Sequence, residues 1–416
     1  MAKLTVAGHL TSLLFACRDG LSEIVSRETS CDSSGKELGA NHMSHQVLAR
    51  IQQLLPEIEA RAQEVEDNRR IPPDLIGKLK EAGVFRAMTP KSFNGEEIDY
   101  PASVDMLTDL ARADGSVGWS LMIGCETPQL LALLPESTFR TLYEASPDVV
   151  VGGAFAPKGS ARSVDGGFEV SGRWGFASGC EHADWLFGNC LVDEGKAGLR
   201  CMMLPASDWQ IHDTWHTAGL KGTGSHDIEL RDTFVPEAYT FDLFGGTPCM
   251  TGPLFAAPLV QFALHIGAVA LGIAEGAVQE LTDFAMSGKT RLYGRGPMLE
   301  SELFQTHLGR AQADAQAARA MLHWRVSEYW ALAAAGDIPV DYQTQVLQTE
   351  AWVVAMCANV VDRCYTAGGG SALYHDSPLQ RRLRDIHTLT QHASAQEGAF
   401  ANAGAAMLGK DQGFGL

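Results

Sequence analysis

The segment GRWGFASG, residues 172–179, places two aromatic rings beside a hydroxyl group. Trp174 and Phe176 alternate with glycines, and Ser178 follows them. A flat, uncharged ring system binds between apolar aromatic walls and is oriented by a hydroxyl or amide at its edge. These residue types therefore suggest a site for a flat ligand. The alternative interpretation is that Trp174 and Phe176 pack inside a β domain and Ser178 is a turn residue.

Motifs for several other chemistries are incomplete. No GxGxxG follows a predicted strand, and SGKT at 287–290 lacks the first glycine of a phosphate-binding loop, because Asp283 stands there. The histidines of HDTWH, residues 212–216, would share a face only on a helix, whereas this region is rich in strand formers. Neither Ser178 nor Ser371 has both glycines of the GxSxG hydrolase motif. The sequence therefore favours none of these enzyme classes.

Apolar periodicity predicts that helices and strands occupy separate parts of the chain. Apolar residues recur every three or four positions from His45 to about Glu66, and three further helical patterns follow before residue 147. Short β-branched and aromatic runs come next, and Asp165–Gly166 predicts a hairpin turn. From about Pro253 the helical period returns in long alanine-rich segments, four of which can form an antiparallel bundle.

The predicted fold class is therefore α+β, mostly α. We expect a helical domain at 43–147, a compact β domain at 148–245 and a helical domain at 246–416. The first 42 residues contain a short apolar stretch that His9, Thr11 and Ser12 interrupt, so we expect a disordered leader and not an export signal. Met43, where helical patterning begins, is a candidate for the physiological start.

Charge and cysteine usage narrow the range of partners. Acidic residues outnumber basic ones 50 to 32, which gives a net charge of −18 and argues against nucleic acid and anionic membranes. The nine cysteines form no CxxC pair, which fits a reducing cytoplasm. The most apolar run begins at Pro258 but contains Gln261, His265 and Glu275, so it predicts a buried helix and no membrane span.

Six segments in order resemble the acyl-CoA dehydrogenase superfamily over nearly everything after Met43. They are ARADGSVGWS, GGAFAP, GRWGFASG, LKGTGSHDIELRDTFVPE, RLYGRGPMLESELFQ and YTAGGGSALYHDSPLQRRLRDIHTLTQH. The WxFxSG form of the third segment and the TQH of the last are closer to the oxygenase components of two-component flavin-dependent monooxygenases, such as p-hydroxyphenylacetate hydroxylase. The resemblance implies an N-terminal helical domain, a central β-barrel and a C-terminal four-helix bundle, assembled as a homotetramer.

The resemblance also implies where a flavin lies. The isoalloxazine ring would sit between the β domain and the bundle, beside Trp174, Phe176 and Ser178, with Phe155 of the GGAFAP strand close by. Further implied cofactor contacts are Arg291 on the pyrophosphate across a subunit interface, Gln305, and the backbone at Gly369. A helix-ending turn explains the glycine run at 368–370 nearly as well. The sequence leaves the choice between FMN and FAD open.

The residue at the position of the catalytic base separates two activities. In many of the acyl-CoA dehydrogenases that the sequence resembles, the carboxylate base lies several residues after the matching Arg–Asp pair, but after Arg384–Asp385 His392 or Ala393 falls there and Glu397 lies too far along. In the oxygenases that it resembles, a histidine at this place contacts the aromatic substrate. A histidine instead suits hydroxylation, because with its usual pKa near 6.5 it can deprotonate or hold a substrate hydroxyl at neutral pH. His392 is therefore the main catalytic candidate, with a helix-capping or solvent-facing histidine as the alternative.

A helix containing GWSLMIGCETPQ is expected to bring Glu126 to the other side of the pocket. Some phenol-hydroxylating relatives carry a second histidine about here, and its absence permits an indole, an amine or a polyketide-like ring. Glu126 could anchor such a substrate or be a solvated helix residue.

The expected reaction uses reduced FMN or FAD from a separate flavin reductase. Reaction with O2 would give a peroxyflavin that hydroxylates or N-oxygenates a small aromatic or amine substrate. Aromatic walls would exclude water while Ser178 hydrogen-bonds near the flavin N5. Oxidation of an acyl thioester, in the manner of the dehydrogenases, is the alternative function.

Overall fold

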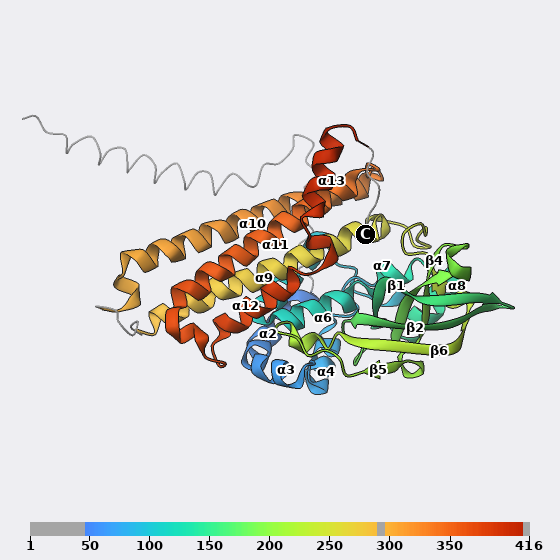
Figure 1. Ribbon diagram of the computed structural model, residues 1–416, viewed down its shortest axis with the longest axis horizontal. Helices are drawn as coiled ribbons and strands as arrows, with labels where there is room; N and C mark the ends of the chain where they lie inside the picture. Colours follow the sequence, from blue (N-terminus) through green and yellow to red (C-terminus); the bar gives the residue numbers. More distant parts are fainter. Residues whose placement is uncertain (1–45, 289–295, 411–416) are drawn as a thin grey trace, which may run out of the picture. The chain divides into compact units, whose positions relative to one another are not determined.

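A computed structural model describes residues 46–288 and 296–410 of the chain (Figure 1). Helices fill the first part of the described chain, as the apolar periodicity predicts. They are α2 (Gln46–Ala60), α3 (Ala62–Asn68), α4 (Pro73–Ala82), α5 (Tyr100–Ala113), α6 (Gly115–Cys125), α7 (Thr127–Leu131) and α8 (Glu136–Ala145). The leader and Met43 lie outside the described residues.

Seven strands follow and form one mixed sheet in the order β5-β6-β2-β1-β3-β4-β7. They are β1 (Val151–Val164), β2 (Gly167–Ala177), β3 (Trp185–Val192), β4 (Leu199–Pro205), β5 (Gln210–His212), β6 (His226–Pro236) and β7 (Thr240–Phe241). The predicted hairpin is present, since Val164 pairs with Gly167 across the Asp165–Gly166 turn. The expected β-barrel is not formed. The sheet is open, with β5 at one edge and β7 at the other, and β1 and β3 pair in parallel.

The sheet packs around the indole of Trp174, which is fully buried. Three glycines make room for this ring: a Cβ on Gly159, Gly172 or Gly188 would lie 2.0, 2.6 or 2.5 Å from it. The indole N–H donates to the carbonyl of Asn189 at 2.7 Å. Large apolar burial of this kind is the main stabilising contribution in such a sheet.

The C-terminal helices α9 (Pro258–Met286), α10 (Glu302–Ala335) and α11 (Tyr342–Gly368) run side by side in Figure 1. α12 (Pro378–Leu389) packs on α9 and α11, and α13 (Gly398–Met407) follows and packs on α11. Within the described residues α9 alone is long and apolar enough to cross a membrane, but 89% of its apolar window is buried inside the protein. This agrees with the prediction of a buried helix.

Helix α6 connects the helical and sheet parts, because it contacts α5, α9, α12 and β1. Its N-terminus is capped by buried Asp114, which accepts from the Val117 N–H at 2.9 Å. Asp385 of α12 lies beside Asp114 and accepts from the Leu220 N–H at 2.6 Å. Burial, reinforced by the neighbouring Asp114 carboxylate, raises the pKa of Asp385 to about 7. α12, α6 and the segment that starts at Leu220 are thereby held together.

Replacing Asp385 by asparagine should flatten the pH dependence of stability. Between its usual pKa of 3.8 and about 7, Asp385 binds more protons in the folded than in the unfolded state, so its contribution falls as pH rises through this window. The introduced amide would keep an oxygen for the Leu220 N–H. Urea unfolding at pH 5 and pH 8 should therefore show a smaller loss of stability in Asp385→Asn, by about 1 kcal/mol or more.

The exposed Asp376 provides a surface control. Asp376→Asn should reproduce the wild-type difference between the two pH values. An equally large difference in Asp385→Asn would show that Asp385 is not the group responsible.

Candidate active site

Ser178, directly after β2, belongs to a chain of hydrogen bonds with a defined direction. The hydroxyl of Thr223 donates to the Leu220 carbonyl at 2.8 Å. Its single hydrogen is thereby used, so Ser225, 2.7 Å away, must donate to Thr223. By the same count Ser178, 2.8 Å from Ser225, donates to Ser225. The Trp119 indole N–H donates to the Ser178 hydroxyl at 3.0 Å. Ser178 can therefore only accept a further hydrogen bond, through its remaining lone pair.

Phe176 presents an exposed aromatic ring two residues before Ser178. Its side chain is 77% exposed, and its φ of 65° lies in the left-handed region that side chains other than glycine rarely adopt. The pairing of β2 with β6 is irregular here, between Trp174 and Ala177. Strained backbone of this kind persists where the surrounding structure enforces it, and it is concentrated at functional sites.

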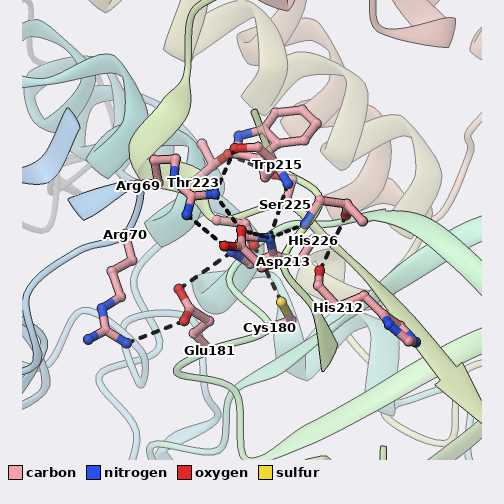
Figure 2. Close-up of polar contacts among 12 residues, drawn as sticks. Arg69, Arg70, Cys180, Glu181, His212, Asp213, Trp215, Thr223, Ser225 and His226 are labelled. Atoms are coloured by element: carbon pink, nitrogen blue, oxygen red, sulfur yellow. Dashed lines mark hydrogen bonds and ion pairs between the residues drawn. The ribbon is translucent and has the colours of Figure 1, made fainter. Parts of the chain in front are cut away.

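The surroundings of Phe176 are braced from the N-terminal helices (Figure 2). Its ring meets Trp215 edge to face, with the centroids 5.9 Å apart. Arg69, at the end of α3, contacts both carboxylate oxygens of Asp213 at 2.5 and 2.9 Å. The His226 Nδ1 accepts from the backbone N–H groups of Thr214 and Trp215 at 3.2 Å each, and burial lowers the pKa of this imidazole. Trp215 is thereby fixed beside Phe176.

His392 follows α12 and caps the short turn Ala393–Ala395, as the capping alternative has it, and its ring also lies beside Trp119. The imidazole and indole centroids are 5.5 Å apart, edge to face. The sequence-predicted His392 and Ser178 are therefore brought together by Trp119, which the sequence analysis did not single out. Burial lowers the pKa of His392 to about 4, so the imidazole is neutral at pH 7. This corrects the expectation that both of its forms are within reach there.

Glu126 is not a solvated residue, because it is buried at the junction of α6 and α7. Its Oε1 lies 2.7 Å from the His265 Nδ1 of α9, and the His265 Nε2 lies 2.8 Å from the Ser103 hydroxyl. Ser103 donates to the Tyr100 carbonyl, so His265 must donate from Nε2 and accept at Nδ1. Glu126 is then a neutral acid that donates to His265, which leaves its Oε2 as an acceptor.

The pKa shifts of this pair support the neutral assignment. Burial raises the pKa of Glu126 well above its usual value and lowers the pKa of His265 to about 3. The sequence analysis missed the pairing, and the only signal was a histidine inside an otherwise apolar helix.

Aromatic residues continue the surface near these groups. Phe155 is 40% exposed and stacks on Phe262, with centroids 6.2 Å apart and planes 16° from parallel. Phe262 and His265 lie three residues apart on α9, and Trp119 and Glu126 lie seven apart along α6, so each pair shares a helix face. The arrangement offers apolar rings together with a few polar atoms, as small-molecule sites do.

The other residues predicted to contact the cofactor are not among the groups described around Ser178. The expectation that Trp174 borders the ligand is wrong, because its ring is enclosed in the sheet core and offers no surface to a ligand. Trp174 instead supports β1 indirectly: its indole N–H donates to the Asn189 carbonyl, and the Asn189 side-chain amide donates to the Phe155 carbonyl at 3.0 Å. Gln305 is exposed on α10 and donates to the Leu299 carbonyl at 2.8 Å. Gly369 ends α11 with a φ of 63°, as the alternative interpretation has it. Arg291 lies outside the described residues.

A reduced flavin fits the groups around Ser178. Its N5–H is a donor, and the lone pair of Ser178 is an acceptor whose direction is set by three further hydroxyl and carbonyl partners. Phe176 supplies an exposed ring for the flat isoalloxazine. Oxidised flavin has an acceptor at N5, which meets the lone pair of Ser178 unfavourably.

Two family models match the chain. The acyl-CoA dehydrogenase N-terminal domain matches residues 46–133, and the acyl-CoA dehydrogenase C-terminal domain matches residues 264–397. Together they cover the helices that carry Trp119, Glu126, His265 and His392.

Curated relatives and a solved structure are more specific. The chain is 36% identical to an indole-3-acetate monooxygenase of Pseudomonas putida, over 84% of this chain and 90% of that protein. It is 31% identical to the oxygenase subunit HsaA of a flavin-dependent monooxygenase from Mycobacterium tuberculosis, over 84% and 91% of the two chains. The crystal structure of 3-HSA hydroxylase from Rhodococcus sp. RHA1 superposes with a TM-score of 0.82 at 29% identity, over 89% and 99% of the two chains.

The direction of the Ser178 chain predicts a preference for reduced flavin that Ser225→Ala should weaken. Without Ser225, the Ser178 hydrogen is free to donate to the N5 of oxidised flavin. The ratio of the Kd for oxidised flavin to the Kd for reduced flavin should fall about fivefold, the value of one hydrogen bond. Anaerobic fluorescence titration with FMN and FAD in both redox states measures it.

Ser207→Ala is the matched control, because Ser207 lies exposed after β4. It should leave the ratio at the wild-type value. An unchanged ratio in Ser225→Ala would contradict the assigned direction.

These relatives are named as monooxygenases and a hydroxylase, and the Mycobacterium tuberculosis protein is named as flavin-dependent, so the oxygenase prediction is confirmed over the dehydrogenase alternative. The chain uses reduced flavin and O2, with the residues around Ser178 fitting that cofactor. It belongs to the acyl-CoA dehydrogenase superfamily, as an oxygenase of the two-component flavin-dependent monooxygenase type.

Proposed function

We propose that this monooxygenase hydroxylates a small aromatic compound of the indole class. The observation that carries the proposal is the neutral Glu126–His265 pair, because its directed hydrogen bonds leave a carboxyl oxygen to accept a ring N–H. A phenol would bring a stronger acid and would favour a histidine at this position. The name of the Pseudomonas putida relative, an indole-3-acetate monooxygenase, supports the same substrate class.

Each residue then has a distinct role. Glu126 accepts the substrate N–H, while Phe155 and Phe262 lie against the aromatic faces and exclude water. His392 points a neutral imidazole toward Trp119 and can hold or donate a proton at its Nε2. When bound beside Phe176 and Ser178, reduced FMN or FAD supplies the activation of O2. A separate flavin reductase of the same cell delivers it, and we place both proteins in the cytoplasm.

The proposal extends to a homotetramer in which α9–α12 of each chain form a four-helix bundle. Helix α10 exposes Leu303 and Trp324 to 61% and 52%. A hollow of about 460 Å³ lies between α10 and α11, and two buried atoms at its rim, the His307 Nδ1 and the Arg363 Nε, have no hydrogen-bond partner among the described residues. Apolar exposure beside unpaired polar atoms is typical of a surface that another chain covers. Gln305, exposed on α10, would then lie at a neighbouring subunit's flavin.

Loss of the Glu126 acceptor should affect only substrates that have a ring N–H. With chemically reduced FMN or FAD and ¹⁸O2, the wild type should add one labelled oxygen to indole-3-acetate. Glu126→Leu should raise KM for this substrate about 10–100-fold, the cost of a buried N–H without an acceptor. Mass spectrometry and oxygen consumption give the two measurements.

Two controls make the outcome specific. Glu126→Gln keeps both a donor for His265 and an acceptor for the substrate and should stay within a few-fold of the wild type. N-methylindole-3-acetate has no N–H, so Glu126→Leu and the wild type should treat it alike. An equal loss on both substrates would contradict the assigned contact.

The proposed assembly can be measured without a ligand. Light scattering coupled to gel filtration should give the mass of four chains, and Leu303→Glu should shift the protein to smaller species, because a charge cannot be buried in that interface. A monomeric wild type would contradict the tetramer.

A further inference from the structure

A buried carboxylic acid is linked to His392 through one intervening hydroxyl. Glu350 of α11 is fully buried, and its Oε1 is 2.5 Å from the Ser394 hydroxyl. Ser394 lies in the short turn Ala393–Ala395 that follows His392, and its hydroxyl is 2.7 Å from the His392 Nδ1. Three polar groups from two segments thus form a line that ends on the imidazole.

Counting hydrogens gives this line a direction. The backbone N–H of Ser394 points at the His392 Nδ1 at 3.4 Å, so this nitrogen is an acceptor and the imidazole carries its hydrogen on Nε2. The Ser394 hydroxyl therefore donates to Nδ1. Having given its one hydrogen to Nδ1, the hydroxyl can accept from Glu350 in its protonated form, whereas an ionised Glu350 would take the Ser394 hydrogen for itself.

The surroundings of Glu350 agree with this assignment. Burial is the largest influence on this carboxyl and raises the pKa of Glu350 to about 8, which keeps the acid protonated at pH 7. Two titratable groups lie close to it: the Tyr100 phenol of α5, whose own pKa is raised mainly by burial, and His392 beyond the Ser394 hydroxyl. No basic side chain among the described residues forms an ion pair with it, and its Oε2 has no hydrogen-bond partner there.

A structural role explains this acid poorly. A buried carboxyl with an unpaired oxygen is costly to keep, and replacing such a group by an apolar residue is commonly neutral or stabilising. Ionisable groups with these features are concentrated at functional sites, where the cost serves the reaction.

We propose that Glu350, acting through Ser394, is a positioning residue that holds His392 in its Nε2–H tautomer and resupplies the proton that His392 gives to an oxygen in the active site. The proposal rests on the assignment of His392 to that site.

The proton transfer along Glu350, Ser394 and His392 conserves protons and charge without forming an imidazolium. The Nε2–H bond breaks and its proton goes to the acceptor oxygen, while the Ser394 O–H proton moves to Nδ1 and the Glu350 proton moves to the Ser394 oxygen. Glu350 is left as a carboxylate and His392 as the other neutral tautomer. The chain is restored when a solvent proton enters at Nε2 and the two inner protons move back. No electrons are exchanged along the line.

Glu350→Gln and Ser394→Ala separate proton supply from packing. The amide introduced by Glu350→Gln keeps a donor to Ser394 but cannot release a proton, so kcat should fall about tenfold or more, and more of the O2 consumed should appear as hydrogen peroxide. In the wild type kcat should also decline above about pH 8, where Glu350 ionises, and this decline should be absent from Glu350→Gln. Ser394→Thr should restore the wild-type rate, and Glu350→Gln/Ser394→Ala should be no slower than the slower single variant.

A second measurement needs neither flavin nor substrate. Nitrogen chemical shifts of ¹⁵N-histidine-labelled protein at pH 7 should show the Nε2–H tautomer of His392 in the wild type and in Glu350→Gln, and a mixture of tautomers in Ser394→Ala. Glu397→Gln, an exposed change three residues from Ser394, is the control for both measurements.

Several outcomes would overturn the proposal. One is a wild-type rate and pH profile in Glu350→Gln, and another is an unchanged tautomer in Ser394→Ala. His392→Asn distinguishes a failure of the underlying assignment: if this variant keeps full activity, His392 is not at the reacting atoms and the relay has no acceptor to serve.

Discussion

The hydrogen bond from the Trp119 indole to Ser178 is the contact on which the site depends. Trp119 lies on α6, which is buried on almost every side, so the indole cannot move without disturbing the packing of α5, α9 and β1. The same ring meets His392 at its edge. One side chain therefore sets the distance between a hydroxyl at the end of a strand and an imidazole after a distant helix. A misplaced donor or base loses most of its catalytic value, and a helix buried at all but one of its positions holds this contact in place.

Enclosure also explains the protonation states. Glu126, Glu350 and Asp385 are buried carboxyl groups, and burial raises the pKa of each. His265 and His392 show the opposite shift for the same reason. In a medium of low polarity a neutral acid beside a neutral imidazole is more stable than an unsolvated ion pair. The polar groups of this site therefore act mainly through directed hydrogen bonds, which suits a reaction that must exclude water.

The direction of each hydrogen bond, and not only its length, determines what these networks present to a ligand. A hydroxyl has one hydrogen, so a backbone carbonyl at one end of a chain decides what the other end presents. The Leu220 carbonyl makes Ser178 an acceptor in this way, and the Tyr100 carbonyl makes Glu126 a donor toward His265. The strained backbone at Phe176 and its brace through Trp215 and Asp213 serve the same end, since they fix a ring that would otherwise be free on the surface.

The sequence by itself determined the order of helices and strands, the hairpin at Asp165–Gly166, the buried nature of α9 and, by resemblance, the superfamily. These depend on local periodicity, turn chemistry and motif order, all of which are properties of contiguous residues. It also pointed to Phe176 and Ser178 by type and spacing and, by resemblance, to His392. It placed Trp174 wrongly, because alternation along a strand does not say which of two aromatic residues faces the core once a register irregularity intervenes.

Only the tertiary structure decided the rest. The open sheet in place of a barrel depends on how the end strands pair, which no single strand encodes. The contacts Trp119–Ser178, His265–Glu126, Ser225–Ser178 and Glu350–Ser394 join residues that are between 44 and 139 positions apart. Their protonation follows from the depth at which they are buried. Contacts of that sequence separation, and the desolvation that goes with them, exist only once the chain is packed, so the residue types were visible in the sequence while their chemistry was not.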